Sequence, residues 1–147
     1  MLIFFDDLGI DTIFVDEAHN FKNISIETKH GSLPGLNPKG SKKCDDLMAK
    51  LRYIQRTHDG RGAVFATGTP ITNSVSDMYT MQRYLGYEHM DELNLLEFDN
   101  WVKMFSEVTE EFEVEANGIG YRLRRRLSRY YNLPELSLLF SDIADLY

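Results

Sequence analysis

Two short apolar segments, about fifty residues apart and each followed at once by polar residues, constrain the fold of this chain most. The first runs from Thr12 into Asp16-Glu17, and the second, Ala63-Val-Phe-Ala, leads into Thr67-Gly-Thr-Pro. Between them, over 41–58, Leu and Ile recur at helical spacing. Two strands joined through a helix are typical of a parallel α/β sheet, whose active sites lie beyond the carboxyl ends of the strands. The sequence therefore predicts an α/β fold with both polar segments at one edge.

The remaining segments are predicted from local patterns. Residues 20–41 are rich in Gly and Pro, which predicts a long loop, and a helix is expected to begin near Asn73 or Ser74 and to end at Leu85. Apolar residues at helical spacing predict an amphipathic helix over 98–112, with Asp99 as its cap. A final helix is expected to follow Leu133-Pro134.

The dipeptide Asn117-Gly118 lies between two segments of alternating polarity, which is a strong β-hairpin signal. Pairing Ala116 with Ile119 sets apolar residues opposite each other on one face and glutamate opposite arginine on the other. The expected pairs are Val114 with Tyr121, Phe112 with Leu123, Glu113 with Arg122, and Glu111 with Arg124.

Length, net charge, cysteine count and the length of the apolar runs argue against several classes of protein. The chain has 147 residues, enough for one domain of ordinary size, and a formal charge of −7, which argues against a stand-alone nucleic-acid binder. Its single cysteine, Cys44, suits a reducing compartment, and its apolar runs fall far short of the ~20 residues that a membrane helix needs. We therefore expect a cytoplasmic protein with no membrane partner.

The tetrad Asp16-Glu17-Ala18-His19 is the first motif that carries chemistry. Adjacent acids at a strand end are what a nucleoside triphosphatase uses to hold Mg²⁺ and to orient or deprotonate water. The tetrad resembles the DEAH box of superfamily 2 helicases and translocases. That resemblance implies that Asp16 reaches Mg²⁺ through water, that Glu17 is the catalytic base, and that His19 couples the nucleotide site to the neighbouring motif.

The second motif is Thr67-Gly68-Thr69-Pro70-Ile-Thr-Asn73. Taken alone, it is a turn after a strand. In its position it resembles motif III of Swi/Snf-type ATPases, which links ATP hydrolysis to movement on DNA. The resemblance implies that Thr67, Gly68 and Thr69 form the coupling segment and that the hydroxyls of the two threonines lie near the Asp-Glu pair.

Further segments resemble the helicase part of the large helicase–DNA methylase proteins of phages and conjugative elements. They are Phe5-Asp-Asp-Leu-Gly-Ile-Asp, Gly120-Tyr-Arg, Arg126-Leu127 and Asn132-Leu-Pro-Glu-Leu. This resemblance implies that residues 1–88 are the latter half of the first RecA-like motor domain, carrying motifs II and III. Residues 89–147 would be a helical and hairpin appendage. The fold class expected is thus a partial RecA-like parallel sheet with flanking helices, followed by a β-hairpin and helices.

A phosphate-binding loop is not found in this sequence. It requires Gly-x-x-x-x-Gly-Lys-[Ser/Thr] between a strand and a helix. The segment Gly35–Lys42 has the glycine spacing, but its Ser and Lys are exchanged, Pro38 removes an N–H, and it follows the Asp-Glu strand. The second motor domain of the family is expected to be absent as well. ATP and Mg²⁺ are expected as cofactors of an intact parent protein and none on this chain alone, which is expected to be inactive or nearly so.

Candidate contacts to DNA are spread along the chain. In the loop region they are Lys22, Lys42 and Lys43, with Asn73 after the second motif. Near the hairpin they are Arg125 and Arg126, within a segment that has five Glu and five Arg over 107–129 and so carries no net charge. A solvated or ion-paired surface is the competing interpretation for each of these cations.

Two other classes of function are kept open. One is a non-enzymatic interaction module derived from a motor domain, whose uncovered strand edges and apolar helix faces favour self-association or binding to the remaining motor-domain segments. The other is a metal-dependent phosphoesterase built on Asp16, Glu17 and His19, for which no further ligand stands at convincing spacing.

Overall fold

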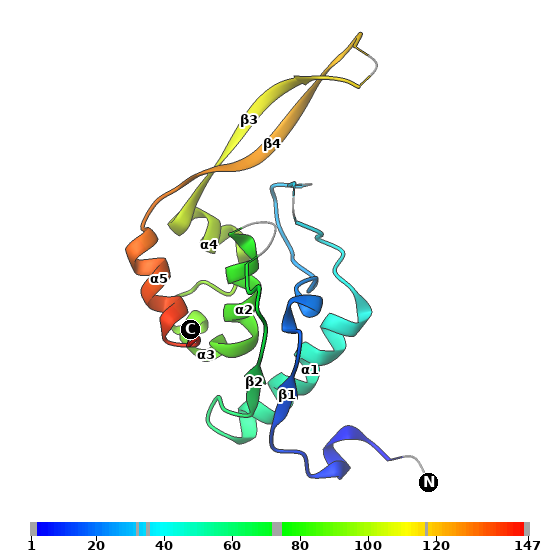
Figure 1. Ribbon diagram of the computed structural model, residues 1–147, viewed down its shortest axis with the longest axis vertical. Helices are drawn as coiled ribbons and strands as arrows, with labels where there is room; N and C mark the ends of the chain where they lie inside the picture. Colours follow the sequence, from blue (N-terminus) through cyan, green and yellow to red (C-terminus); the bar gives the residue numbers. More distant parts are fainter. Residues whose placement is uncertain (1–2, 32, 35, 72–74, 117, 146–147) are drawn as a thin grey trace.

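A computed structural model describes residues 3–31, 33–34, 36–71, 75–116 and 118–145. Helices and strands are mixed, with one two-stranded parallel sheet and one antiparallel hairpin (Figure 1). The predicted combination of a small parallel sheet, flanking helices and a hairpin is confirmed at this level. None of the helices in the described ranges combines the length and apolar character that a membrane crossing requires.

The parallel sheet joins β1 (Ile13–Val15) to β2 (Ala63–Phe65), with Ile13 opposite Ala63 and Val15 opposite Phe65. Helix α1 (Lys42–Thr57) connects the two strands, as its spacing of apolar residues predicts. It buries Leu47, Leu51 and Ile54 on one face, with Cys44 fully buried near its start. Because the strands are parallel, their carboxyl ends lie side by side.

Gly62 allows the chain to enter β2 directly from the turn after α1. Its φ is +107°, in the region that favours glycine, and a Cβ there would collide with the Ile54 side chain and the Asp11 carbonyl. The Gly62 carbonyl accepts a 2.8 Å hydrogen bond from the Ile13 N–H, which starts the β1–β2 ladder.

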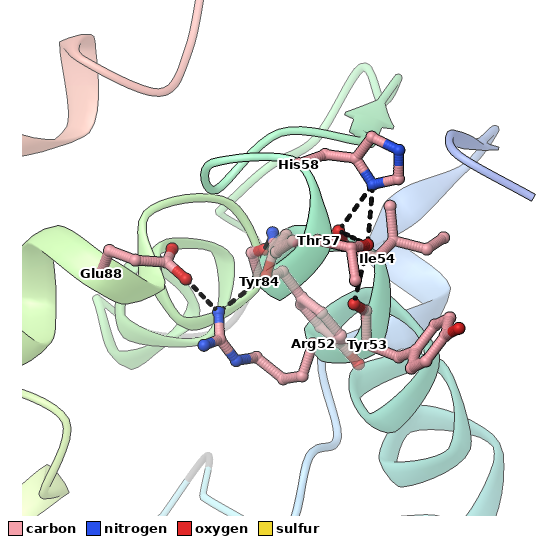
Figure 2. A network of polar contacts seen from close by, with 8 residues as sticks. Arg52, Tyr53, Ile54, Thr57, His58, Tyr84 and Glu88 are labelled. Atoms are coloured by element: carbon pink, nitrogen blue, oxygen red, sulfur yellow. Dashed lines mark hydrogen bonds and ion pairs between the residues drawn. The ribbon is translucent and has the colours of Figure 1, made fainter. Parts of the chain in front are cut away.

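The end of α1 is fastened to the neighbouring helices by polar contacts (Figure 2). An Arg52 guanidinium N–H donates to Glu88 of α3 (Tyr87–Glu92) at 2.8 Å, and the Gln55 amide donates to the Tyr84 carbonyl of α2 (Ser76–Leu85) at 2.7 Å. Gln55 is buried, so this bond replaces the water that its amide loses on folding. These contacts fix α1 against the helices that follow β2.

An aromatic cluster forms the core between α2 and α4 (Phe98–Phe105). The Trp101 ring lies 5.7 Å from Tyr79, 6.2 Å from Phe98 and 5.4 Å from Phe105, measured between centroids. All four side chains are buried, and the Trp101 Nε1–H donates to the Gln82 side chain at 3.0 Å. The last helix is present as predicted, and this helix α5 (Leu133–Ser141) adds Leu136 and Phe140 to the buried residues.

The predicted helix over 98–112 is wrong in its second half. Helix α4 ends at Phe105, and strand β3 (Ser106–Val114) follows without a loop. Val108, Phe112 and Val114 stand at even spacing with polar residues between them, which also fits a strand, and pairing with β4 (Tyr121–Tyr130) satisfies its backbone. Asp99 does not cap the helix either, because the residue at the N-cap position of α4 is Glu97.

The hairpin register is confirmed. Val114 pairs with Tyr121, Phe112 with Leu123, Glu113 with Arg122 and Glu111 with Arg124. The strands are longer than predicted and reach back to Ser106 and Tyr130. Figure 1 shows this hairpin extending away from the rest of the molecule, and the apolar face of its outer half is exposed.

The described residues between Lys22 and Ser41 are irregular, as predicted for the loop over 20–41, but they are anchored. Ile24, Ile26 and Leu33 are buried, and Asp45 of α1 accepts bonds from the Ser25 N–H at 2.8 Å and the Ser25 hydroxyl at 2.6 Å. Two short 3-10 helices, η1 (Phe5–Leu8) and η2 (Ala18–Phe21), lie on either side of β1. The division at residue 88 into motor domain and appendage stays a prediction.

Candidate functional site

The two polar motifs meet at the carboxyl edge of the parallel sheet. Asp16 and Glu17 follow β1, and Thr67–Thr69 follow β2 after one intervening residue. The Ala66 N–H donates to the Val15 carbonyl at 2.8 Å, and the Ala18 N–H donates to the Ala66 carbonyl at 3.0 Å. The ladder is thereby extended past the strands, so both polar segments are held side by side.

The acidic pair lies at the surface in a tight turn. Glu17 has φ 49° and ψ 47°, a left-handed conformation that is uncommon for a residue with a side chain. The Asp16 carboxylate accepts a 2.8 Å hydrogen bond from the Glu17 N–H. The Glu17 side chain is 63% exposed, so this carboxylate is open to a ligand or to water. Backbone strain of this kind is concentrated at functional sites.

His19 connects the two motifs. Its Nδ1 lies 3.1 Å from the Thr67 hydroxyl oxygen and 3.1 Å from a carboxylate oxygen of Glu17. The Thr67 hydroxyl also accepts a 3.2 Å bond from the Thr69 N–H. Glu17, His19, Thr67 and Thr69 therefore form a continuous polar chain across the edge of the sheet. Gly68 between the threonines is exposed, and among the described residues other than its chain neighbours no atom stands within 4 Å of the place where a Cβ would be.

Lys22 joins the same edge from the inside. Its ammonium donates to the Thr69 carbonyl and to the Asp77 carboxylate, each at 3.1 Å. The two side chains of this ion pair are only 8% and 9% exposed. Sequence reasoning missed Asp77, because an acid in the first turn of a helix is ordinarily a solvated residue that favours the helix dipole.

The other candidate cations lie elsewhere. Lys42 and Lys43 begin α1 and are exposed, and the Lys43 ammonium stands 5.1 Å from the centroid of the Phe21 ring. Arg125 and Arg126 are in β4 of the projecting hairpin, where they form ion pairs with Glu110 and Glu113 respectively. Asn73 lies outside the described residues. The structure thus brings Asp16, Glu17, His19, Lys22 and the Thr67–Thr69 segment together and places the two arginines on a separate element.

A metal site made by the protein alone is not found in the described part of the chain, where no three or more His, Cys, Asp or Glu side chains are grouped for it. Mg²⁺ in nucleotide sites, however, is commonly held by one or two carboxylates together with substrate phosphates and water. An exposed Asp16 at the end of a strand fits that ligand type, since one of its oxygens remains available beside the one that accepts from Glu17.

Comparison with known proteins gives three results. A family model described as a probable helicase domain matches residues 2–147. Defense against restriction protein B of Escherichia phage P1 is 28% identical over 118 residues, which are 78% of this chain and 5% of that protein. DNA repair protein RAD5 of Gibberella zeae is 33% identical over 76 residues, which are 52% of this chain and 5% of that protein. The chain thus spans a small part of the relatives it matches, and no solved structure matches it significantly.

Proposed function

The chain belongs to the probable helicase domain family, and we propose that it supplies the ATP-hydrolysis and coupling motifs of an ATP-dependent DNA helicase or translocase. The finer assignment is to the Swi/Snf-like superfamily 2, with a DEAH box and a RecA-like motor fold. The observation that carries this proposal is the His19–Thr67 contact at 3.1 Å, which joins two motifs 48 residues apart in the chain.

In this proposal each residue at the edge has a distinct task. Glu17 accepts the proton of the attacking water, for which its exposed carboxylate is free to approach a ligand. Asp16 holds Mg²⁺ through water, and when bound this ion would neutralise charge on the phosphates. His19 keeps the Glu17 carboxylate and the Thr67 hydroxyl in one hydrogen-bonded arrangement, so that a change at the first is felt at the second.

The proposal includes a dependence on other segments. The 147 residues contain no phosphate-binding loop motif, so we expect ATP to bind only when further parts of a motor protein are present. Calorimetric titration of this chain with Mg²⁺ and a non-hydrolysable ATP analogue is expected to show no binding. Binding that disappears in Asp16→Ala would instead mean that the phosphates are held by residues of this chain.

The decisive experiment is Glu17→Gln in a helicase-family protein that contains this segment. The expected result is loss of ATP turnover with retained nucleotide binding, because the amide keeps the shape of the side chain and cannot accept the proton. Glu92→Gln is the matched control, since Glu92 is exposed on α3, away from the edge. Turnover that persists at the wild-type rate in Glu17→Gln would refute the proposed role.

DNA is the proposed partner of such a protein. Lys42 and Lys43, exposed at the start of α1, are the first candidates for phosphate contacts, with Asn73 as a further one. Each lysine contact that is lost is expected to lower the slope of log K against log salt by about 1, whereas the neutral Asn73 should leave the slope unchanged. The ion-paired Arg125 and Arg126 are expected to change that slope less, because Glu110 and Glu113 already offset their charge.

A non-enzymatic interaction module is the second candidate, and the hairpin favours it. Phe112 and Tyr121 are each 75% exposed and Ile119 is 90% exposed, on an element that extends from the body. Such a surface is typical of a contact with another chain or another segment. Self-association is tested by measuring the molar mass in solution of the wild-type chain and of the Phe112→Ser variant. The module alternative is favoured if Glu17→Gln changes neither turnover nor partner binding in the longer protein.

A further inference from the structure

We propose that Lys22 and Asp77 form an internal link that positions the Thr67–Thr69 segment relative to the loop after β1. They would then be positioning residues of the site, with Lys22 directed inward and not toward DNA. The inference rests on the proposed function, since the position of this segment matters for turnover only if the edge serves a nucleotide.

The link spans three parts of the chain. Lys22 directly follows η2, Thr69 lies in the segment after β2, and Asp77 is in the first turn of α2. The Lys22 ammonium donates to the Thr69 carbonyl and to the Asp77 carboxylate at 3.1 Å each. One side chain therefore fixes the second motif both to the loop of the first motif and to the helix behind it.

Stability alone does not account for this pair. Both side chains are more than nine-tenths buried, and the attraction between the two charges only partly offsets the free energy of removing them from water. Two apolar side chains would hold α2 against the loop at least as well. What an apolar pair could not supply is a donor to the Thr69 carbonyl, which is the contact that defines the position of the segment.

The backbone N–H and carbonyl of Thr69 both form hydrogen bonds with side chains of this site. Its N–H donates to the Thr67 hydroxyl at 3.2 Å, and its carbonyl accepts from Lys22. The Thr67 hydroxyl is also the group that stands 3.1 Å from Nδ1 of His19. Loss of the Lys22 contact would therefore change the geometry of the hydroxyl that His19 meets.

A small cavity beside the link leaves room for movement. Its volume is about 110 Å³, and its lining includes His19, Lys22, Asp77 and Thr80. The pair is thus buried but not close-packed, so its side chains have space to rearrange while the surrounding core stays in place. A rearrangement there would move Thr69 and the start of α2 together.

The first test needs neither nucleotide nor activity. Nitrogen chemical shifts of the His19 ring are measured by NMR in the 147-residue chain, in Lys22→Met and Asp77→Asn. Lys50→Met is the matched control, because Lys50 forms an exposed ion pair with Asp46 on α1. We expect the His19 Nδ1 signal to shift in the first two variants and to stay unchanged in the control. If Lys22→Met fails to fold, Asp77→Asn preserves the size of the side chain and is expected to give the shift. A folded Lys22→Met or Asp77→Asn with an unchanged His19 signal would overturn the proposal.

The second test uses steady-state ATP hydrolysis by a helicase-family protein that contains this segment. Lys22→Met is expected to lower kcat roughly ten- to hundredfold, as misplacement of catalytic groups does, with KM for ATP nearly unchanged. The salt slope of DNA binding is expected to stay at its wild-type value. A reduced slope with normal kcat would mean that Lys22 contacts DNA, and would refute the link. If both Glu17→Gln and Lys22→Met leave ATP turnover intact, the proposed function is refuted. If Glu17→Gln abolishes turnover and Lys22→Met leaves it intact, only the proposed role of the link is refuted.

Discussion

The aromatic cluster between α2 and α4 and the outer half of the β3–β4 hairpin have similar side chains in opposite environments. Trp101 and Phe105 are fully buried, whereas Phe112, Tyr121 and Ile119 are at least 75% exposed. Both sets follow the period of their own element, 3.6 residues in the helix and 2 in the strands. The difference teaches that a periodic apolar pattern identifies a face but not whether the chain itself covers that face.

The two regions also differ in how their polar groups are used. In the cluster, the Trp101 ring and the Tyr79 hydroxyl donate to protein acceptors, Gln82 at 3.0 Å and the Leu96 carbonyl at 2.6 Å. In the hairpin, arginines of β4 form ion pairs with glutamates of β3 in contact with water. Buried hydrogen bonds cost more to break than surface ion pairs do. Stability should therefore be concentrated in the cluster.

Trp101→Ala is expected to have the largest effect. It would remove the centre of the cluster and leave the buried Gln82 without its Trp101 donor, so the free energy of unfolding should fall by about 3–5 kcal/mol. Denaturant titration followed by circular dichroism measures this loss. Trp101→Phe, which keeps most of the ring packing, should lose clearly less. A loss below about 1 kcal/mol for the alanine variant would mean that the cluster does not dominate stability.

Asp99→Asn tests the contact between α4 and the anchored loop. The Asp99 carboxylate accepts from the Thr28 hydroxyl at 2.6 Å and from the Lys29 N–H at 3.0 Å. Burial alone would raise the pKa of Asp99, but these hydrogen bonds and the nearby His30 and Lys29 lower it below its ordinary 3.8. Because the folded-state pKa is the lower one, the contact stabilises the protein fully above pH 3.8 and loses its effect as the pH falls through the folded-state value.

The expected loss for Asp99→Asn is about 1.5–3 kcal/mol at pH 7, the range for hydrogen bonds to a charged group. Thermal unfolding of the wild type and the variant from pH 7 to pH 2 is the measurement. The two curves of Tm against pH should converge at the acid end. Parallel curves over the whole range would show that the charge of Asp99 contributes nothing to folding.

Glu113→Gln tests the charged face of the hairpin. Glu113 accepts from Arg124 at 2.9 Å and also pairs with Arg126, although Arg124 lies opposite Glu111 in the register. Both arginines are well exposed, so the loss should be no more than about 1 kcal/mol and should vanish in 1 M salt. Glu111→Gln serves as the control. The free energy of unfolding of both variants is measured at low salt and in 1 M salt. A salt-independent loss would contradict the surface character of the pair.

Phe112→Ser should have the smallest effect on stability, within about 0.5 kcal/mol, because its ring is already 75% in contact with water. The same denaturant titration applies. A loss above about 2 kcal/mol would show that this face is covered in solution, and the contrast with the aromatic cluster would then disappear.

Local patterns predicted much of the fold. The positions of α1, both parallel strands and the hairpin register follow from periodicity and from Asn117-Gly118, because each is decided by residues near one another in the chain. The helix expected over 98–112 fails for an identifiable reason. Val108 and Phe112 continue the helical spacing of Phe98–Phe105 and also fit the alternation of a strand, and only the partner strand decides between them.

The site was predictable to the extent that topology decides it. Parallel strands place Asp16 and Thr67 at one edge, as the sequence indicates. The contact between Lys22 and Asp77 was not predictable, since the two residues are 55 positions apart and each alone is typical of a solvated surface. A buried ionic contact between distant residues leaves no periodic signal in a single sequence.

The parallel pairing of β1 with β2 also has a consequence for how the chain folds. It joins residues about fifty positions apart, whereas the hairpin strands are separated by six residues, and closing the longer loop costs about 2 kcal/mol more in chain entropy. Contacts between distant residues form late and set the folding rate. The hairpin can thus form on its own within microseconds. The edge that carries Asp16-Glu17 and Thr67–Thr69 can assemble only after most of the chain up to α2 has been made and has collapsed. Its formation therefore indicates that the N-terminal half has folded.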